Sequence, residues 1–235
     1  MLGSGFPTVL VPGSALPRLR QAAVHLDLDA RLEPSASATV IGHLGQGDAA
    51  PPVVVATSLS GWFRCAGERG TGTAVALQLA QDLAERWPVL VVGTTGHELQ
   101  YLGLRRFLAA QARHPAAVIF LGADLATIKL GPESGETCPS FHQARTTAGE
   151  GLAKRLEAVL APARFPVRSN PAQWSGEGEE WVRLGAPLLS LASRSPLFHT
   201  ADDLPEHATS PEQLAVTYTA VSRAAQLFLA ESLRA

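Results

Sequence analysis

Four residues of the kinds that bind metal ions stand beside the ends of predicted strands: Glu68, Glu98, Asp124 and His199. Carboxylate oxygens and imidazole nitrogens are common zinc ligands, and a site needs several of them within bonding distance of one point. In open α/β sheets, ligands bind beyond the carboxyl ends of the strands. Asp124 also has a simpler explanation, as a cap or turn residue. The sequence therefore predicts that these four side chains converge on a metal site.

Further polar and aromatic residues fall at the same strand ends. His97 directly precedes Glu98, whereas Ser58, Ser60 and Trp62 follow an earlier strand. Because histidine titrates near neutral pH, it is a common general base, and we predict that His97 is catalytic. It could instead be a metal ligand or a hydrogen-bonded histidine of the crevice. We expect Ser58, Ser60 and Trp62 to line the pocket, although core packing also explains Trp62.

The elements that must position these residues follow from the apolar pattern. Short apolar runs rich in β-branched residues predict buried strands at 53–57, 89–94, 117–121 and 187–192. Apolar residues at helical spacing predict helices at 76–87, 99–112, 149–160 and 180–184. This alternation predicts a three-layer α/β fold, in which helices cover both faces of a central mixed, mainly parallel sheet.

Other segments are predicted from turn and cap residues. Additional strands are expected at 7–11, 23–32 and 38–44, the second of them because apolar and polar residues alternate. The segment 131–148 is rich in Pro, Gly, Ser and Thr and predicts a long surface loop, and 162–179 is expected to be irregular. The last helix should begin with Ser210 as N-cap, Pro211 at the first helical position and Gln213 in a capping box.

Three segments contain motifs in a characteristic order: CAGERGTG at 65–72, HELQYLG at 97–103 and FHTADD at 198–203. Together with Asp124 in GADLATI, they resemble the dinuclear-zinc aminopeptidase family, which also includes glutaminyl cyclases, from about Ala38 to the C-terminus. The resemblance implies the zinc-exopeptidase fold and metal-ligand positions at Glu98, Asp124 and His199. Glu68 takes the place of the aspartate that bridges the two zinc ions in the family.

The departures from the family pattern concern one of the two metal sites and the base. Ser58 and Ser60 stand where the family has a ligand histidine and the aspartate beside it, and His97 stands where it has its general-base glutamate. The resemblance implies that one zinc site has lost a ligand at Ser58, so that one zinc ion is expected rather than two. The ligands of the remaining site would be Glu68, Glu98 and His199.

The resemblance implies a metallo-hydrolase that acts on peptides or small amides, with weak or unconventional activity because its ligands are altered. Two alternatives stay open. A non-catalytic relative would keep the pocket as a binding or scaffold module without a cofactor, and Glu68 and Arg69 would then form an internal ion pair. A metal-free hydrolase would use Ser58 or Ser60 with His97, although the sequence has no Gly-x-Ser-x-Gly elbow.

Composition argues against several other classes. The net charge is −2 and no basic run occurs, so nucleic-acid binding is not expected. The sequence contains no run of 18 apolar residues, so no transmembrane helix is expected. It also lacks a signal-peptide pattern, which makes the cytoplasm the default location. The 235 residues suit one domain over 1–235, in which 1–32 could be the tail of a preceding or inserted segment. Cys65 and Cys138 would allow one disulfide, and no pattern indicates an oligomeric state.

Overall fold

The chain divides into two compact units, Met1–Ser37 and Ala38–Ala235. The computed structural model describes residues 11–45, apart from single residues at 12, 22, 28, 30 and 32, and then 50–111, 113–128 and 141–234. In the first unit the described residues form η1 (Gly13–Ala15) and α1 (Leu16–Leu19). The expectations of one domain over 1–235 and of a tail at 1–32 stay predictions. The strands and the other helices of the described residues all belong to the second unit.

The strand predicted at 23–32 is wrong, because the described residues of that range lie in no strand and are exposed. Strands are stabilised by side-chain pairs with a neighbouring strand, and an alternating pattern does not by itself supply that neighbour. Apart from Val11, the strand predicted at 7–11 lies outside the described residues, as does Cys138, one of the two cysteines of the disulfide that the sequence would allow.

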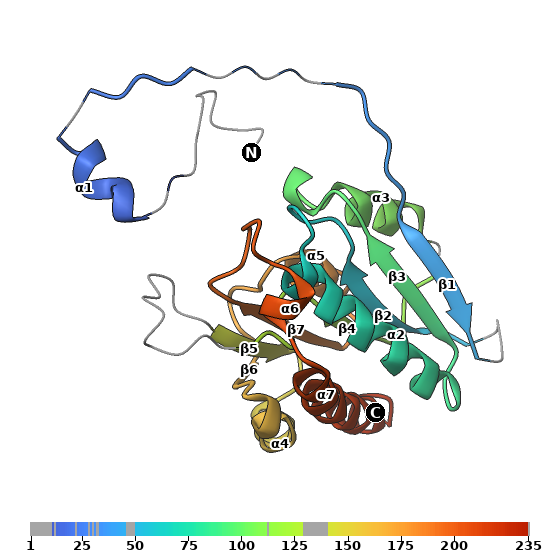
Figure 1. Cartoon of the computed structure of the whole chain (residues 1–235). Helices are drawn as coiled ribbons and strands as arrows, with labels where there is room; N and C mark the ends of the chain where they lie inside the picture. Colours follow the sequence, from blue (N-terminus) through green and yellow to red (C-terminus); the bar gives the residue numbers. More distant parts are fainter. Residues whose placement is uncertain are drawn as a thin grey trace. The chain divides into compact units, whose positions relative to one another are not determined.

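One mixed sheet of seven strands forms the centre of the described part of the second unit (Figure 1). The strands are β1 (Val40–Leu44), β2 (Val53–Ser58), β3 (Val89–Thr94), β4 (Ala117–Leu121), β5 (Phe141–Thr146), β6 (Val167–Ser169) and β7 (Leu188–Arg194). Their order across the sheet is β1-β3-β2-β4-β7-β5-β6. The central strands β3, β2, β4 and β7 are parallel, whereas β1 and β5 run antiparallel to their neighbours β3 and β7. The predicted mixed, mainly parallel sheet is confirmed.

Helices cover both faces of this sheet (Figure 1). One face packs against α2 (Thr71–Ala84), α4 (Glu150–Leu160) and α7 (Pro211–Ser232), and the other against α3 (Leu102–Ala110) and α5 (Gly178–Trp181). Alternate residues of a strand point to opposite faces, so Val53 and Val55 join the first core and Val54 joins the second. Burial of both faces explains why the central strands are continuous apolar runs.

Short helical turns also occur among the described residues of the second unit. They are η2 (Ala66–Gly70), η3 (His97–Leu99), η5 (Ala161–Ala163), η6 (Val182–Leu184) and α6 (Pro205–Ala208). The last long helix begins as predicted, because the Ser210 hydroxyl accepts a hydrogen bond from the Gln213 backbone N–H at 3.2 Å. The Gln213 side chain donates to Thr217 instead of returning to Ser210, so only half of the expected capping box forms. No helix of the described residues is both long and apolar enough to cross a membrane.

The surface loop predicted at 131–148 is wrong over its last part, where β5 pairs with β7. Polar residues obscured this strand, and the structure supplies them with partners: His142 Nδ1 lies 2.9 Å from the Ser193 hydroxyl, and Arg145 donates to Ser175. The short strand β6 similarly falls inside the segment 162–179 that was expected to be irregular. Residues 131–140 of the predicted loop lie outside the described part of the chain.

Candidate metal centre

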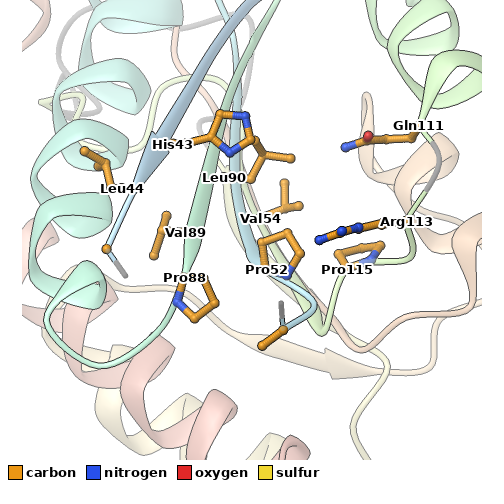
Figure 2. A pocket seen from close by; sticks show the side chains of 12 residues that line it. His43, Leu44, Pro52, Val54, Pro88, Val89, Leu90, Gln111, Arg113 and Pro115 are labelled. Atoms are coloured by element: carbon orange, nitrogen blue, oxygen red, sulfur yellow. The ribbon is translucent and has the colours of Figure 1, made fainter. Parts of the chain in front are cut away.

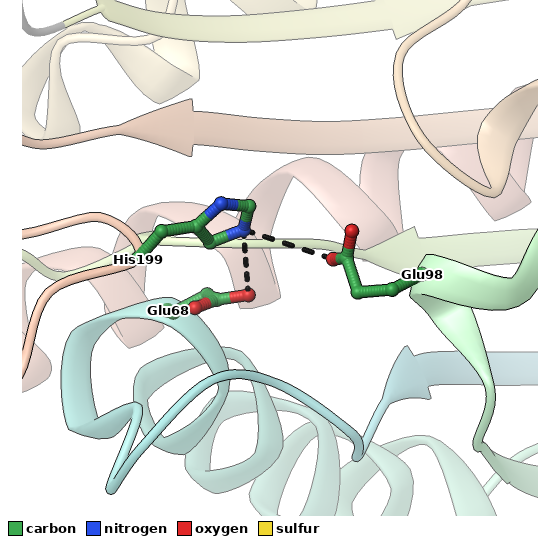
Figure 3. Close-up of side chains that lie close together, drawn as sticks. All are labelled: Glu68, Glu98 and His199. Atoms are coloured by element: carbon green, nitrogen blue, oxygen red, sulfur yellow. Dashed lines mark ion pairs between the residues drawn. The ribbon is translucent and has the colours of Figure 1, made fainter. Parts of the chain in front are cut away.

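Three of the four predicted ligands surround one point at the carboxyl ends of the parallel strands (Figure 3). One ligand atom each from Glu68, Glu98 and His199 lies within 4.8 Å of the other two. His199 Nε2 is 3.4 Å from Glu68 Oε1 and 3.7 Å from Glu98 Oε1. Two ligand atoms of a tetrahedral zinc ion with bonds of about 2.1 Å lie ~3.4 Å apart. The spacing of these side chains therefore fits a zinc ion without large rearrangement.

The same three side chains include polar atoms that lack hydrogen-bond partners. Glu68 is completely buried, and neither oxygen of its carboxylate forms a hydrogen bond; the same holds for Nε2 of His199. A buried carboxylate without a partner is costly, and almost all buried polar groups in proteins are satisfied. A cation between these atoms would satisfy them, and the donor set of two carboxylates and one imidazole occurs in catalytic zinc sites.

Glu68 is positioned by the π-helical turn η2, which leads directly into α2. The buried carboxylate of Asp203 accepts hydrogen bonds from the backbone N–H groups of Gly67 and Glu68, at 2.6 and 3.0 Å. Only glycine fits at position 67, because a Cβ atom there would lie 2.8 Å from Asp124 Oδ1 and 2.9 Å from Asp203 Oδ1. Asp203 ends the FHTADD segment at 198–203, but sequence reasoning missed this contact, which joins the two loops of the site.

His199 lies in the loop after β7 and is held by aromatic neighbours. Its ring stacks on Phe198 with a centroid distance of 3.9 Å, and the Trp62 ring lies 6.0 Å away on the other loop. The hydroxyl of Thr200 donates to the backbone carbonyl of Leu197 at 2.7 Å and closes the turn around the histidine. Trp62 is exposed, so core packing does not explain it, and its indole faces solvent beside His199.

A buried arginine also approaches the two carboxylates. Arg69 Nη2 lies 2.9 Å from Glu68 Oε1 and 3.7 Å from Glu98 Oε1, and Arg69 Nε donates to the backbone carbonyl of Ser60 at 2.8 Å. The contact with Glu68 is an ion pair but not a hydrogen bond, since both Nη2 and Oε1 lack hydrogen-bond partners. Arg69 therefore supplies part of the positive charge that the carboxylates need, but both oxygens of Glu68 still lack a hydrogen-bond partner.

The structure does not bring Asp124 into this group of three ligands. Its Oδ2 accepts a hydrogen bond from the Ser195 backbone N–H at 3.0 Å, and its Oδ1 accepts one from the Thr127 hydroxyl at 2.9 Å. Asp124 has positive φ and is fully buried. These contacts match the alternative in which Asp124 fixes the turn after β4.

His97 stands next to Glu98 at the centre of a separate hydrogen-bond network. Its Nδ1 lies 3.2 Å from Glu177 Oε1 and 3.2 Å from the Ser58 hydroxyl. Glu177 is fully buried, and its second oxygen accepts a 2.6 Å hydrogen bond from the Thr94 hydroxyl. The His97 backbone N–H donates to the Ser60 hydroxyl at 3.2 Å. Sequence reasoning missed Glu177, which lies in the Pro-, Gly- and Ser-containing segment 162–179.

This network does not have the geometry of a serine hydrolase. In such enzymes the nucleophile and the carboxylate contact opposite nitrogens of the histidine, so that the imidazole can take the proton of the serine. Here Ser58 and Glu177 contact the same nitrogen of His97, and Ser58 is almost fully buried. The arrangement is suited to holding the imidazole in one orientation.

No protein-family model and no curated protein matches the sequence, but solved structures do. A zinc aminopeptidase from Bacillus subtilis superposes with a TM-score of 0.61 at 17% identity, over 80% of this chain and 49% of that chain. The aminopeptidase LapA of Legionella pneumophila gives 0.56 at 17% identity, over 83% and 54%. A glutaminyl cyclase from Porphyromonas gingivalis gives 0.55 at 14% identity, over 80% and 76%.

The chain has the zinc-exopeptidase fold. At this level of identity, the similarity concerns the fold alone. It confirms the fold that was expected from the order of the sequence motifs. The chain spans about half the length of the first solved structures that it matches.

Within this zinc-exopeptidase fold, burial controls the charge of the candidate ligands. Burial raises the pKa of the Glu68 carboxyl to about 7. The charge of Arg69 lowers this pKa, whereas the nearby carboxylates, above all Glu98, raise it further. Burial also raises the pKa of Asp124 to about 6 and lowers the pKa of His199. Near pH 7 the metal-free site therefore holds Glu68 only partly ionised and favours a neutral imidazole at His199.

We expect the stability of the metal-free protein to depend on pH through Glu68. Its folded pKa of about 7 exceeds the ordinary value of 4.5, so its stabilising contribution is complete below about pH 4.5 and is lost as pH rises through about 7. Between pH 5 and 8, in EDTA, the wild type should lose roughly 2–3 kcal/mol of unfolding free energy relative to Glu68→Gln. Urea unfolding at both pH values measures this difference. The exposed control Glu206→Gln keeps Glu68, so its stability should change with pH as that of the wild type does. If the free energy of unfolding changes between the two pH values by the same amount in the wild type and in Glu68→Gln, the expectation is wrong.

A separate pocket lies at the other end of the parallel strands, beside the amino ends of β2 and β3 (Figure 2). Its volume is about 250 Å³, and His43, Pro52, Pro88 and Arg113 are among its lining residues. It contains none of the predicted site residues. The candidate metal centre is instead the place where buried ligand atoms without hydrogen-bond partners lie close together.

Proposed function

We propose that this protein is a zinc-dependent hydrolase of the aminopeptidase type, which holds one metal ion and acts on peptides or small amides. The main support for this proposal is that three ligand atoms, from Glu68, Glu98 and His199, lie within 4.8 Å of one another. Two of these residues have buried atoms with no hydrogen-bond partner. The fold supports the same reaction class, since the similar solved structures include aminopeptidases from several bacteria.

The surrounding side chains suit amide hydrolysis. A zinc ion bound here would polarise the substrate carbonyl and acidify a water molecule. His97 would serve as the base, because Glu177 and Ser58 hold its Nδ1 and leave Nε2 as the nitrogen that exchanges a proton. Trp62 presents an exposed indole beside His199 and would form an apolar wall for the substrate.

A second zinc ion is not part of this proposal. Ser58, at the position of a family ligand, is engaged with His97, and a hydroxyl at that point does not replace an imidazole ligand. Both carboxylate oxygens of Asp124 already accept hydrogen bonds from the protein. We therefore propose low turnover compared with a two-zinc aminopeptidase.

Metal content tests the proposal. Elemental analysis of protein purified in the presence of zinc should find one zinc ion per chain in the wild type. Glu98→Gln and His199→Ala should each retain far less, because each removes one of three protein ligands. The exposed carboxylate variant Glu206→Gln is the matched control and should keep its zinc. Two zinc ions per chain, or one that persists in both ligand variants, would contradict the one-site assignment.

A non-catalytic relative is the second candidate, and the position of Arg69 favours it. Its guanidinium already lies within ion-pair distance of Glu68 and Glu98, where it could stand in for the metal charge. The same zinc analysis separates the two functions. If the guanidinium replaces the metal, the wild type retains no zinc and Arg69→Gln gains it. If the single-metal hydrolase is correct, the wild type retains zinc before any substitution.

A further inference from the structure

Two arginines lie side by side on neighbouring strands away from the candidate metal centre. Arg145 of β5 and Arg168 of β6 are direct partners in the parallel register of the two strands. Neighbouring strands are about 4.8 Å apart and paired residues point to the same face, so the two guanidinium groups leave the sheet together. Like charges in this arrangement destabilise a sheet unless something neutralises them.

No carboxylate of the described residues neutralises this pair. None of the ion pairs in the described part of the chain includes Arg145 or Arg168. Arg145 donates from Nη1 to the hydroxyl of Ser175, but its Nε is buried and has no hydrogen-bond partner. Burial, and secondly the charge of Arg168, lowers the pKa of Arg145. The guanidinium nevertheless remains protonated in proteins, so its positive charge persists.

The two arginines line a hollow of about 530 Å³ on the surface. Ser169 and Gln173 add polar side chains to its wall. Glu150 contributes a carboxylate, which takes part in none of the ion pairs of the described residues. The volume lies within the range of sites for small ligands. None of the residues around Glu68, Glu98 and His199 lines this hollow.

We propose that this hollow is an oxyanion-binding site, in which Arg145 and Arg168 together hold a carboxylate or phosphate group. The planar guanidinium presents paired N–H donors that match two oxygens of either group, and such hydrogen bonds are among the stronger ones in proteins. A bound oxyanion would offset the repulsion between the two charges. The proposal does not depend on metal binding or on hydrolytic activity.

Calorimetric titration of the whole chain tests this site with two probes, inorganic phosphate and N-acetylglycine, at constant ionic strength maintained with sodium chloride. We expect saturable binding of at least one probe at one site per chain. Arg168→Gln should weaken that binding by about tenfold or more, because it removes a charged donor pair. Arg86→Gln changes an exposed arginine elsewhere and should leave the affinity unchanged. Saturation by phosphate alone, or by N-acetylglycine alone, identifies which oxyanion the site prefers.

Thermal unfolding of the same variants distinguishes a binding role from a structural one. Without either probe, Arg168→Gln should melt at the same temperature as the wild type or above it, because the substitution relieves like-charge repulsion. With the probe, the wild type should gain more stability than the variant. Absence of saturable binding, or equal affinity in wild type and Arg168→Gln, would overturn the proposal.

Discussion

Asp203→Ala should lower the free energy of unfolding by about 3 kcal/mol, the largest stability loss expected from a single change at the site. Its buried carboxylate accepts hydrogen bonds from the backbone N–H groups of Gly67 and Glu68. Without it, two donors inside the protein lose their acceptor, and each hydrogen bond to a charged group contributes roughly 1.5–3 kcal/mol. Removal of a negative charge near Glu68 offsets part of the loss. Urea denaturation with an unchanged m-value measures the effect.

The neighbouring residue gives a matched control. Asp202 is exposed, and Asp202→Ala should change stability by no more than about 0.5 kcal/mol. Asp203→Asn keeps an acceptor oxygen without the charge and should fall between the two alanine variants. If Asp202→Ala and Asp203→Ala are equally stable, the contact between the two loops does not contribute as inferred.

His97→Ala should reduce kcat for hydrolysis of an aminoacyl anilide by about 10²–10⁴-fold in the zinc-loaded protein, because it removes the proposed base. Glu177→Gln should cause a smaller loss in kcat with little change in KM, since it leaves the imidazole in place but no longer fixes its Nδ1. Neither substitution removes a proposed zinc ligand, so the zinc content should remain that of the wild type. The assay therefore separates loss of the base from loss of the metal.

The exposed histidine His207 provides the comparison for this experiment, and His207→Ala should keep wild-type turnover. If His97→Ala retains both zinc and full turnover, another group acts as the base. If the zinc-loaded wild type shows turnover equal to that of a two-zinc aminopeptidase, the expectation of low activity is wrong.

The central sheet could be predicted because its strands are buried on both faces. β2, β3, β4 and β7 are short apolar runs with Gly, Pro or polar residues at their ends, and few other structures explain such runs. β5 has a different composition, with His142, Gln143 and Arg145 among its six residues, so its pairing depends on partners that lie far away in the sequence.

The candidate site was predictable only as far as its motifs reach. Glu68, Glu98 and His199 lie within recognisable segments, and their roles as ligands stay predictions. Asp203 and Glu177 act through contacts with residues 136 and 80 positions away, which no local pattern encodes. The exposure of Trp62 depends in the same way on how the loop after β2 leaves the sheet.

The hydrogen bonds between Asp203 and the turn at Gly67 also constrain the order of folding. They join positions 136 apart, and closing so long a loop is entropically unfavourable until the sheet between them has formed. A chain that ends before Asp203, as during its synthesis, lacks the hydrogen bonds that hold the backbone at Gly67 and Glu68. It therefore also lacks the geometry of the completed metal centre. A metal ion that binds only the completed centre would therefore slow unfolding and leave the rate of folding nearly unchanged.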